Sequence, residues 1–516
     1  MTFAGPAYVP ILPDEADIDR VFAMIREARI GGPFWAPPRD ERPTLIVRAA
    51  SAAEAGALLA GMDEADRASA FCLPPADDAD PWPLLTPGTR LVAHGDDELA
   101  ALAHIAGCAV QLLSAGRFGA TESDIRGAVA REIFGRRYRD PFTGQGSDIC
   151  ATIELLAEWR RILAANRGIV VACGMAWWKR HEIGRFLWKP GQSLRFFRSG
   201  RRAVLHAKRL GGAVAIWPSR VTPSLIERAH ARGVALIRVE DGFIRSMGLG
   251  ANLVPPSSIT VDRLGIHYDP CGPSDMERLL AESTFPPPLI ERAQALRSAI
   301  LRAGIGKYGR ADSHVFPARE PDRRLVLVPG QVEDDMSVLK GGHGLSSNLE
   351  LLRRARALEP DAEIWFRPHP DVDAGHRNGV VHDDEALIHA DQVIRGGAMA
   401  RLLDVVDAVH VLTSLTGFEA LMRGLDVTCH GTPFYAGWGL TRDLTPIPDR
   451  RGRALSVDEL VAGVLILYPR YLDPVTGLPC RPEVLIRRMA EGTARNRLGW
   501  VSRIRKLQGR LMRHFA

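Results

Sequence analysis

The stretch RLVLVPGQ, residues 324–331, is an apolar run of strand length that stops at a proline and a glycine. Three similar runs follow it along the chain: AEIWFRPHP (362–370), ADQVI (390–394) and AVHVLTS (408–414). Short apolar runs that alternate with helical patterns are typical of parallel sheets with crossover helices. We therefore predict a Rossmann-like domain over residues 321–450.

A second block of the same kind precedes this one. It holds the runs GIVVACGMA (168–176), AVAIWP (213–218) and VALIRVE (234–240), and a polar stretch at residues 319–324 separates the two blocks. The predicted fold class is α/β, with Rossmann-like domains over residues 166–320 and 321–450 that face a cleft. Ligands of such sheets bind at the carboxyl ends of the strands, so the residues after each run are the functional candidates.

Residues 1–165 are rich in alanine and proline and contain a faint internal repeat. YRDPFTG (138–144) echoes YLDPVTG (471–477), and residues 91–110 echo residues 410–429. In the longer pairing, Ser414, Thr416 and Glu419 of the later copy align with Gly95, Asp97 and Ala100 of the earlier copy, so these polar residues are not kept. Chance likeness of two alanine-rich helices explains the longer pairing almost as well, whereas the DPxTG pairing is harder to dismiss as chance. We interpret residues 1–165 as a degenerate, non-catalytic half-module.

The composition is that of an ordinary globular protein of roughly two to four domains. The formal net charge of +5 is too small to argue for nucleic acid and slightly favours anionic substrates or surfaces. Seven cysteines without a CxxC pair fit a reducing compartment. The chain has neither a signal-peptide pattern nor an apolar stretch of about 18 residues, so we predict a cytoplasmic protein. From the small net charge we predict that it binds no nucleic acid.

Acidic residues follow a predicted strand in each block. EDGFIRSMGLG (240–250) opens with Glu240 and Asp241, and adjacent carboxylates suit acid/base work because their repulsion raises one pKa. A helix N-cap explains the pair equally well. PGQVEDDMS (329–337) holds Glu333, Asp334 and Asp335, a pattern that is commonly only a cap. Since both blocks carry such a turn, we expect carboxylates to face each other across the cleft.

Two further loops offer hydrogen-bond donors to a phosphate. In RPHPD (367–371), His369 lies between two prolines with Arg367 beside it, although most His-Pro pairs are plain loop residues. The DxD formed by Asp371 and Asp373 is interpreted as solvated loop acids. TSLTGFEALMRG (413–424) places hydroxyls at a helix start, which suits a phosphate and an ordinary N-cap equally. None of these motifs is a Walker loop, a GxGxxG fingerprint, a zinc cluster or a Ser-His-Asp order.

In combination these motifs resemble the KpsC/LipB-type capsule polysaccharide proteins, which are retaining β-Kdo glycosyltransferases. The resemblance runs from about residue 174 to residue 477, through VEDGFIRSMGLG, PPSSITVDRLGIHYDP, PGQVEDD, RPHPDV, LTSLTGFEALMRG and GTPFYAGWGLT in that order. It implies a GT-B-like pair of Rossmann-type domains, with the acceptor on residues 166–320 and the CMP-sugar on residues 321–450. Full-length members look like two fused catalytic modules, whereas this chain keeps one, so one activity is expected.

The resemblance also implies a mechanism. The chain would move Kdo, an acidic eight-carbon sugar, from CMP-β-Kdo to a lipid-linked capsule polysaccharide acceptor through a covalent carboxylate adduct. Asp335 would be the nucleophile, with Asp334 as the alternative, and Glu333 would orient its neighbour. Glu240 would be the acid/base carboxylate, with Asp241 as the fallback.

A donor site is implied as well. His369, Ser414 and Thr416 would hold the CMP phosphate, and Arg245 or Lys340 would pair with the carboxylate of the sugar. The same motifs contribute the remaining candidates for donor binding: Gln331, Arg367, Pro370 and Glu419. Such donors suffice for a monophosphate leaving group, so neither a metal nor a cofactor is expected beside the donor substrate.

The C-terminal segment, residues 451–516, is expected to be helical and to end in a basic tail. From residue 492 onward there is no acidic residue, and seven basic ones alternate with apolar ones at helical spacing: Arg495, Arg497, Arg503, Arg505, Lys506, Arg510 and Arg513. Such a helix rests on anionic lipid, or packs on the protein as a solvated helix. A lipid-linked acceptor favours a peripheral position on the cytoplasmic face of the inner membrane, with other capsule assembly proteins as partners.

Two alternatives to this function remain. One is a transferase for another CMP-linked acidic sugar, such as sialic acid. The other is a non-catalytic capsule assembly or export factor, against which the intact Glu240, Asp335 and His369 argue, because erosion would be expected at these positions.

Overall fold

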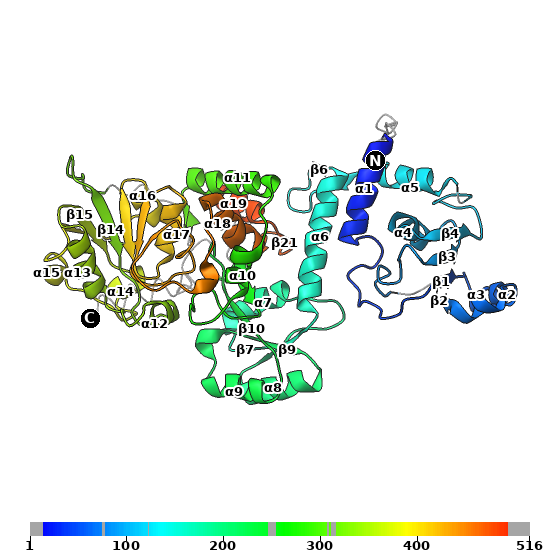
Figure 1. Ribbon diagram of the computed structural model, residues 1–516, viewed down its shortest axis with the longest axis horizontal. Coiled ribbons are helices and arrows are strands. Elements are labelled where there is room, and N and C mark those ends of the chain that lie inside the picture. Colours follow the sequence, from blue (N-terminus) through cyan, green and yellow to red (C-terminus); the bar gives the residue numbers. More distant parts are fainter. Residues whose placement is uncertain are drawn as a thin grey trace, which may run out of the picture. The chain divides into compact units, whose positions relative to one another are not determined.

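The computed structural model describes residues 14–74, 78–121, 123–245, 254–306, 309–310 and 316–493. The chain divides into two compact units (Figure 1). The first comprises Met1–Arg167 and Trp188–Ser193, and the second comprises Gly168–Leu187 and Leu194–Ala516.

The first unit contains four parallel strands in the order β2-β1-β3-β4. Helices α1, α4 and α6 contribute Phe22, Ile105 and Ile153 to one apolar core. A hairpin, β5 with β6, leads into α6, whose N-cap is the Asp148 side chain. The elements are β1 (Leu45–Arg48), β2 (Ala70–Cys72), β3 (Arg90–Ala93), β4 (Ala109–Leu112), β5 (Tyr138–Arg139), β6 (Gly146–Ser147), α1 (Glu15–Ala28), α2 (Ala52–Ala60), α3 (Glu64–Ser69), α4 (Glu98–Ala106), α5 (Ile125–Phe134) and α6 (Ile149–Asn166).

The second unit begins with a lobe built on parallel strands β8-β7-β9-β10, extended by the antiparallel strands β11, β20 and β21. Alternate strand residues form two cores, one with Ile183 and Phe186 of α7 and the other with Val204 of α8 and Leu225 of α9. Cover on both faces explains the continuous apolar runs. The elements are β7 (Ile169–Cys173), β8 (Arg195–Phe197), β9 (Ala213–Ile216), β10 (Leu236–Asp241), β11 (Ser258–Asp262), η1 (Trp177–Lys179), α7 (Arg180–Phe186), α8 (Gly200–Arg209) and α9 (Pro223–Ala231).

The second lobe of this unit has six parallel strands in the order β16-β15-β14-β17-β18-β19. In chain order this is 3-2-1-4-5-6, the arrangement of Rossmann sheets. All seven apolar runs of the sequence coincide with strands, and the predicted α/β fold with two Rossmann-type domains is confirmed. The elements are β14 (Leu325–Pro329), β15 (Glu363–Arg367), β16 (Gln392–Val393), β17 (Ala408–Val411), β18 (Asp426–Cys429), β19 (Arg442–Asp443), α12 (Met336–Gly341), α13 (Asn348–Leu358), α14 (Pro370–Asp373), α15 (Asp383–Ala386), α16 (Met399–Leu402) and α17 (Leu415–Leu421).

The C-terminal segment returns to the first lobe. Strand β20 (Arg470–Leu472) pairs with β11, where Ser258 lies opposite Tyr471, and β21 (Pro479–Cys480) pairs with β20. A wholly helical segment was therefore the wrong expectation, although α18 (Val457–Val461) and α19 (Pro482–Ala490) are helices. The predicted basic tail, from residue 494 on, lies outside the described residues. Within the described part of the chain, no helix has the length and apolarity needed to span a membrane.

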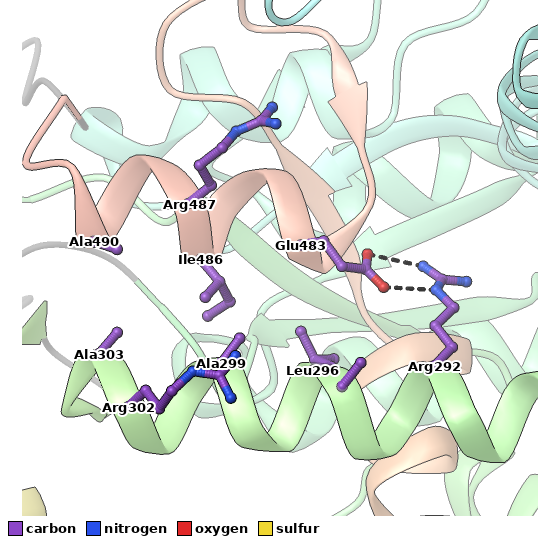
Figure 2. A pocket seen from close by; sticks show the side chains of 10 residues that line it. Arg292, Leu296, Ala299, Arg302, Ala303, Glu483, Ile486, Arg487 and Ala490 are labelled. Carbon is purple, nitrogen blue, oxygen red and sulfur yellow. Dashed lines mark hydrogen bonds and ion pairs between the residues drawn. The ribbon is translucent and has the colours of Figure 1, made fainter. Parts of the chain in front are cut away.

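Helices α11 (Pro287–Ala303) and α19 lie side by side in the second unit (Figure 2). An ion pair joins them, in which Arg292 donates to both carboxylate oxygens of Glu483 at 2.6 and 2.9 Å. Small side chains such as Ala299 and Ala303 leave a cavity of about 530 Å³ beside this contact. None of the predicted site residues lines it.

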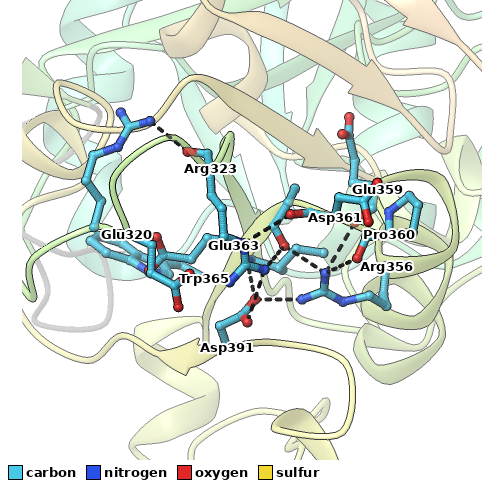
Figure 3. A network of polar contacts seen from close by, with 12 residues as sticks. Glu320, Arg323, Arg356, Glu359, Pro360, Asp361, Glu363, Trp365 and Asp391 are labelled. Carbon is cyan, nitrogen blue, oxygen red and sulfur yellow. Dashed lines mark hydrogen bonds and ion pairs between the residues drawn. The ribbon is translucent and has the colours of Figure 1, made fainter.

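Charged side chains pair closely at the amino edge of the second lobe's sheet (Figure 3). Asp391 accepts hydrogen bonds from Arg356 at 2.6 Å and from the Ile364 amide at 2.7 Å. Glu363, buried at the start of β15, accepts from the Trp365 indole at 2.7 Å. These acids are occupied by protein partners, so their role is to hold the sheet.

The first unit repeats two features of the second unit. Its sheet order β2-β1-β3-β4 matches β15-β14-β17-β18, the order found where residues 91–110 were aligned with residues 410–429. In the two DPxTG turns, the same backbone bond closes the loop: Gly144 donates to the Asp140 carbonyl at 2.8 Å, and Gly477 to the Asp473 carbonyl at 2.7 Å. Each turn joins a hairpin that leads into a helix, α6 or α19. Shared topology and turn geometry favour common descent over chance likeness.

A buried histidine pair predicts an acid-sensitive second lobe. His410 and His430 are 0% and 2% exposed and their ring nitrogens lie 3.1 Å apart. Burial lowers the pKa of His410 to about 4 and that of His430 to about 3. Because both values lie below the unfolded value of about 6.5, stability is fully present above that pH and falls as the pH drops toward 4, by about 1.4 kcal/mol per pH unit for each histidine.

The measurement is the free energy of unfolding between pH 7 and pH 4.5. His430→Gln is expected to flatten this pH dependence, because one of the two titrating groups is lost. An identical slope in wild type and variant would contradict the prediction.

Candidate functional site

The second lobe brings two sequence-predicted loops together at its topological switch point. Strand order reverses between β14 and β17, which is where open α/β sheets bind ligands. Gln331, just after β14, accepts from the Thr413 amide at 2.8 Å and donates to the Thr413 hydroxyl at 3.0 Å. Gln331 thus holds one loop against the other, and both of these side-chain hydrogen bonds serve to position the two loops.

The acidic turn after β14 gives its three carboxylates different surroundings. Glu333 accepts from the Asn348 amide at 2.7 Å and so orients the turn. Asp334 is exposed and forms a surface ion pair with Arg377 at 2.9 Å. Asp335 caps α12, since its Oδ1 accepts from the Ser337 amide and hydroxyl at 2.9 and 2.7 Å. Among the described residues Oδ2 of Asp335 accepts no hydrogen bond, so Asp335 presents one carboxylate oxygen for chemistry.

The His-Pro loop after β15 holds its histidine in one tautomer. Nδ1 of His369 accepts the Asp371 amide at 3.1 Å, with Pro370 as the first residue of α14. An accepting Nδ1 places the proton on Nε2, which makes Nε2 a hydrogen-bond donor. Asp373, the second acid of the DxD, pairs with Arg395 at 2.8 Å.

Arg367 has a structural role that the sequence did not predict. It is only 8% exposed, and its guanidinium donates to the carbonyls of Gly396 and Gly397. These bonds tie the end of β15 to the following loop. Arg367 therefore positions this loop, and its predicted part in donor binding stays a prediction.

In the loop after β17, the two predicted hydroxyl residues hydrogen-bond to each other. The Ser414 hydroxyl accepts from the Thr416 amide at 3.2 Å and donates to the Thr416 hydroxyl at 3.0 Å. Tyr435 fixes this loop by donating to the Ser414 carbonyl. Glu419, 8% exposed inside α17, lies beside Gly306, where an added Cβ would stand 3.2 Å from its carboxylate.

The carboxyl edge of the first lobe carries a buried ion cluster. Lys179, after β7, donates to both oxygens of Asp241 at 3.0 Å, and Arg245 donates to Asp241 at 2.7 Å. The Lys179 ammonium also lies 3.5 Å from the ring centre of Trp217, which follows β9. Lys179 was not among the predicted residues, because a lone lysine after a strand carries no signal in the sequence.

This cluster changes two predicted roles. Burial would raise the pKa of Asp241, but Lys179 and Arg245 hold it at about 2, so this carboxylate stays ionised and is not a general acid/base. Arg245 is 1% exposed and also donates to the Val254 carbonyl, so it is not available to a sugar carboxylate. The capping alternative for Glu240 and Asp241 is wrong too, because both lie in β10 and no helix begins in the described residues 242–245.

Glu240 is the remaining acid of this edge. It is half-buried and lies in β10 opposite Thr260 of β11, and its Oε1 accepts from the Asp241 amide at 3.1 Å. The ion pair of Asp241 therefore fixes the backbone that carries Glu240.

The two lobes contact each other beside these acids. Phe243 of the first lobe and Phe434 of the second have ring centres 4.7 Å apart, and Lys340 of α12 pairs with Asp269 at 3.3 Å. Burial raises the pKa of the Tyr268 hydroxyl, and the negative charges of Glu240, Asp335 and Asp269 raise it further. Tyr268 is thus influenced by the charge of one acid from each lobe, Glu240 and Asp335.

Among its described residues, the first unit has no equivalent of Asp335 or His369 at the matching strand ends. Where β14 leads to Gln331 and Asp335, the matching strand β1 leads to Ala49, Ala50 and Ser51. Where β15 leads to His369, β2 leads to Pro74. The repeat therefore keeps a fold without the side chains of the site.

Two Rossmann-type lobes, each with an acidic residue at its carboxyl edge, define a GT-B-like protein. The chain belongs to the family of capsule polysaccharide biosynthesis proteins, whose family profile matches residues 212–319 and 308–471. The predicted KpsC/LipB-type family is thereby confirmed.

Relatives extend this assignment. The chain is 40% identical over 340 residues to capsule polysaccharide modification protein LipA of Neisseria meningitidis serogroup A, covering 66% of this chain and 48% of LipA. It is 46% identical over 241 residues to lipopolysaccharide-processing protein LpsZ of Rhizobium meliloti, covering 46% of this chain and 54% of LpsZ. The chain thus spans about half the length of the curated relatives it matches.

Two solved structures are similar to this chain. Both are of Thermosulfurimonas dismutans KpsC, described as a beta Kdo 2,7 transferase and a beta Kdo 2,4 transferase. The first is 34% identical with a TM-score of 0.52, and the second 32% identical with a TM-score of 0.54. The match covers 63% of this chain in each case, and 99% and 98% of the two structures.

Proposed function

We propose that this chain is a retaining β-Kdo glycosyltransferase that moves Kdo from CMP-β-Kdo to a lipid-linked capsule polysaccharide acceptor. The observation that carries the proposal is the near-complete cover of two Kdo transferase structures by 63% of this chain. The second unit holds an acid at the carboxyl edge of each lobe.

The proposed chemistry is a double displacement. A free oxygen of Asp335 attacks the anomeric carbon of Kdo, the bond from that carbon to the CMP phosphate oxygen breaks, and CMP leaves. Glu240 then takes the proton of the acceptor hydroxyl, whose oxygen attacks the same carbon and releases Asp335. Two inversions give net retention, and the products are CMP, the glycoside and one proton.

The donor site is proposed on the second lobe. Nε2–H of His369 and the hydroxyls of Ser414 and Thr416 are suitable donors to the CMP phosphate. Lys340, 44% exposed, is a suitable cation for the sugar carboxylate. Glu333 and Gln331 support this site by positioning its loops.

Placement at the cytoplasmic face of the inner membrane is part of the proposal. It is supported by the seven basic and no acidic residues of the tail, which suit anionic lipid, and by the lipid-linked acceptor.

The test is transfer by the purified protein from CMP-Kdo, made in the same vessel, to a Kdo-ended lipid acceptor, with product mass as the readout. CMP-sialic acid serves as the competing donor. We expect a mass gain of one Kdo or more with the first donor only. Turnover with the second donor alone, or silence with both, would overturn the proposal.

A further inference from the structure

Tyr268 has a hydroxyl that is unpaired among the described residues. It lies in the loop between β11 and α10 (Asp275–Glu282), and its oxygen is buried without a hydrogen-bond partner in the described part of the chain. Buried polar groups are nearly always paired, so an unpaired one needs an explanation. A ligand that fits against it is one such explanation.

The loop that carries Tyr268 is firmly held. One oxygen of Asp262 accepts the amides of Leu264 and Gly265 at 3.0 and 2.8 Å, and the other accepts the Asp275 amide at 2.9 Å and the Tyr468 hydroxyl at 2.8 Å. Four bonds to one carboxylate fix both ends of the loop. The phenol is therefore presented at a defined place.

That place lies between the lobes. The neighbouring residue Asp269 pairs with Lys340 of the second lobe, and His267 packs against both Phe243 and Phe434, at 5.0 and 6.0 Å between ring centres. The carboxylates of Glu240 and Asp335 act on the phenol from opposite lobes. Burial and these charges raise the pKa of Tyr268, so it keeps its proton and remains a donor.

A third anion enters this place in the proposed reaction. Kdo carries its carboxylate on the anomeric carbon, the atom between Asp335 and Glu240 during transfer. A carboxylate held beside two others needs donors of its own. Arg245 is buried and held by Asp241, whereas the neutral phenol has no partner among the described residues. The Lys340 ammonium pairs with Asp269 at 3.3 Å but is 44% exposed, so a second anion can reach it.

We propose that the Tyr268 hydroxyl donates a hydrogen bond to the carboxylate of the transferred sugar, beside Lys340, and so selects 2-keto acid sugars as donors. The inference rests on the proposed function and adds a substrate-contacting residue to it. The predicted contact is with the sugar and not with CMP.

Tyr268→Phe tests this, with Tyr471→Phe as its matched control. The Tyr471 hydroxyl is also buried but donates to the Leu465 carbonyl at 2.7 Å. Tyr268→Phe is expected to lower kcat/KM for CMP-Kdo by about 10- to 100-fold, with Tm unchanged and the inhibition constant of CMP alone unchanged. Tyr471→Phe is expected to lower Tm and to leave kcat/KM unchanged.

Three results would overturn the inference. Wild-type kcat/KM in Tyr268→Phe would mean that the phenol contacts no reacting group. A parallel loss of CMP inhibition would mean that it acts through the shape of the site. Silence of the wild type with CMP-Kdo would remove the proposed function and this inference together, whereas the first two results remove the inference alone.

Discussion

Replacing Asp335 with asparagine is expected to abolish the covalent Kdo adduct and to lower Kdo transfer by about 10⁴-fold. The proposed double displacement needs a carboxylate that bonds to the anomeric carbon, and an amide does not supply it. Asparagine is as good an N-cap as aspartate, so α12 keeps its start and the loss reports chemistry rather than folding.

The measurement is intact-protein mass spectrometry after a short incubation with CMP-Kdo, beside a transfer assay. Asp334→Asn discriminates between the two neighbouring acids, because Asp334 pairs with Arg377 on the surface. An adduct on Asp334→Asn and none on Asp335→Asn assigns the nucleophile. The reverse pattern would place it at Asp334, and an adduct on both would place it elsewhere.

Asp241→Asn is expected to destabilise the protein by about 3 to 5 kcal/mol. Lys179 and Arg245 have side chains 9% and 1% exposed, and Asp241 is the carboxylate to which both donate. Loss of its charge leaves two cations in a buried place, which costs more than the loss of one hydrogen bond.

Thermal unfolding followed by tryptophan fluorescence checks this, since Trp217 lies against Lys179. A fall in Tm of about 10 °C is expected. Asp334→Asn is the control for stability, because its ion pair is exposed and contributes at most about 1 kcal/mol. Equal Tm values for Asp241→Asn and Asp334→Asn would contradict the assigned role of the buried cluster.

The lowered pKa of Asp241 makes the stability contributed by its ion pairs with Lys179 and Arg245 depend on pH. Its folded value of about 2 lies below the unfolded value of about 3.9. The stabilisation is therefore complete above pH 4 and is lost as the pH falls toward 2.

The sequence was sufficient for the parts of the fold that depend on local pattern. Buried parallel strands such as β14 and β17 are continuous apolar runs, and the acids at the end of β10 and after β14 are visible as motifs. The returning strand β20 was missed, because its partner β11 is far away in the chain and the pairing leaves no local trace.

Side-chain roles were harder to predict, because they depend on partners. Arg245 and Arg367 carry the charge that an anionic ligand needs, and only the structure reveals that Asp241 and two glycine carbonyls already occupy them. Lys179 belongs to no motif, and Tyr268 lies in the motif of residues 255–270 without a chemical pattern that gives it a role. Their meaning comes from burial and from neighbours that are distant in sequence.

The long-range pairing of β11 with β20 delays the completion of the first lobe's sheet during synthesis. Strand β11 ends at Asp262 and β20 begins at Arg470, so about 200 further residues must leave the ribosome before the outer edge of β11 is covered. At about 5–20 residues per second this takes roughly 10 to 40 s. During that interval the nascent first lobe exposes a bare strand edge, the kind of surface that recruits chaperones and seeds aggregation.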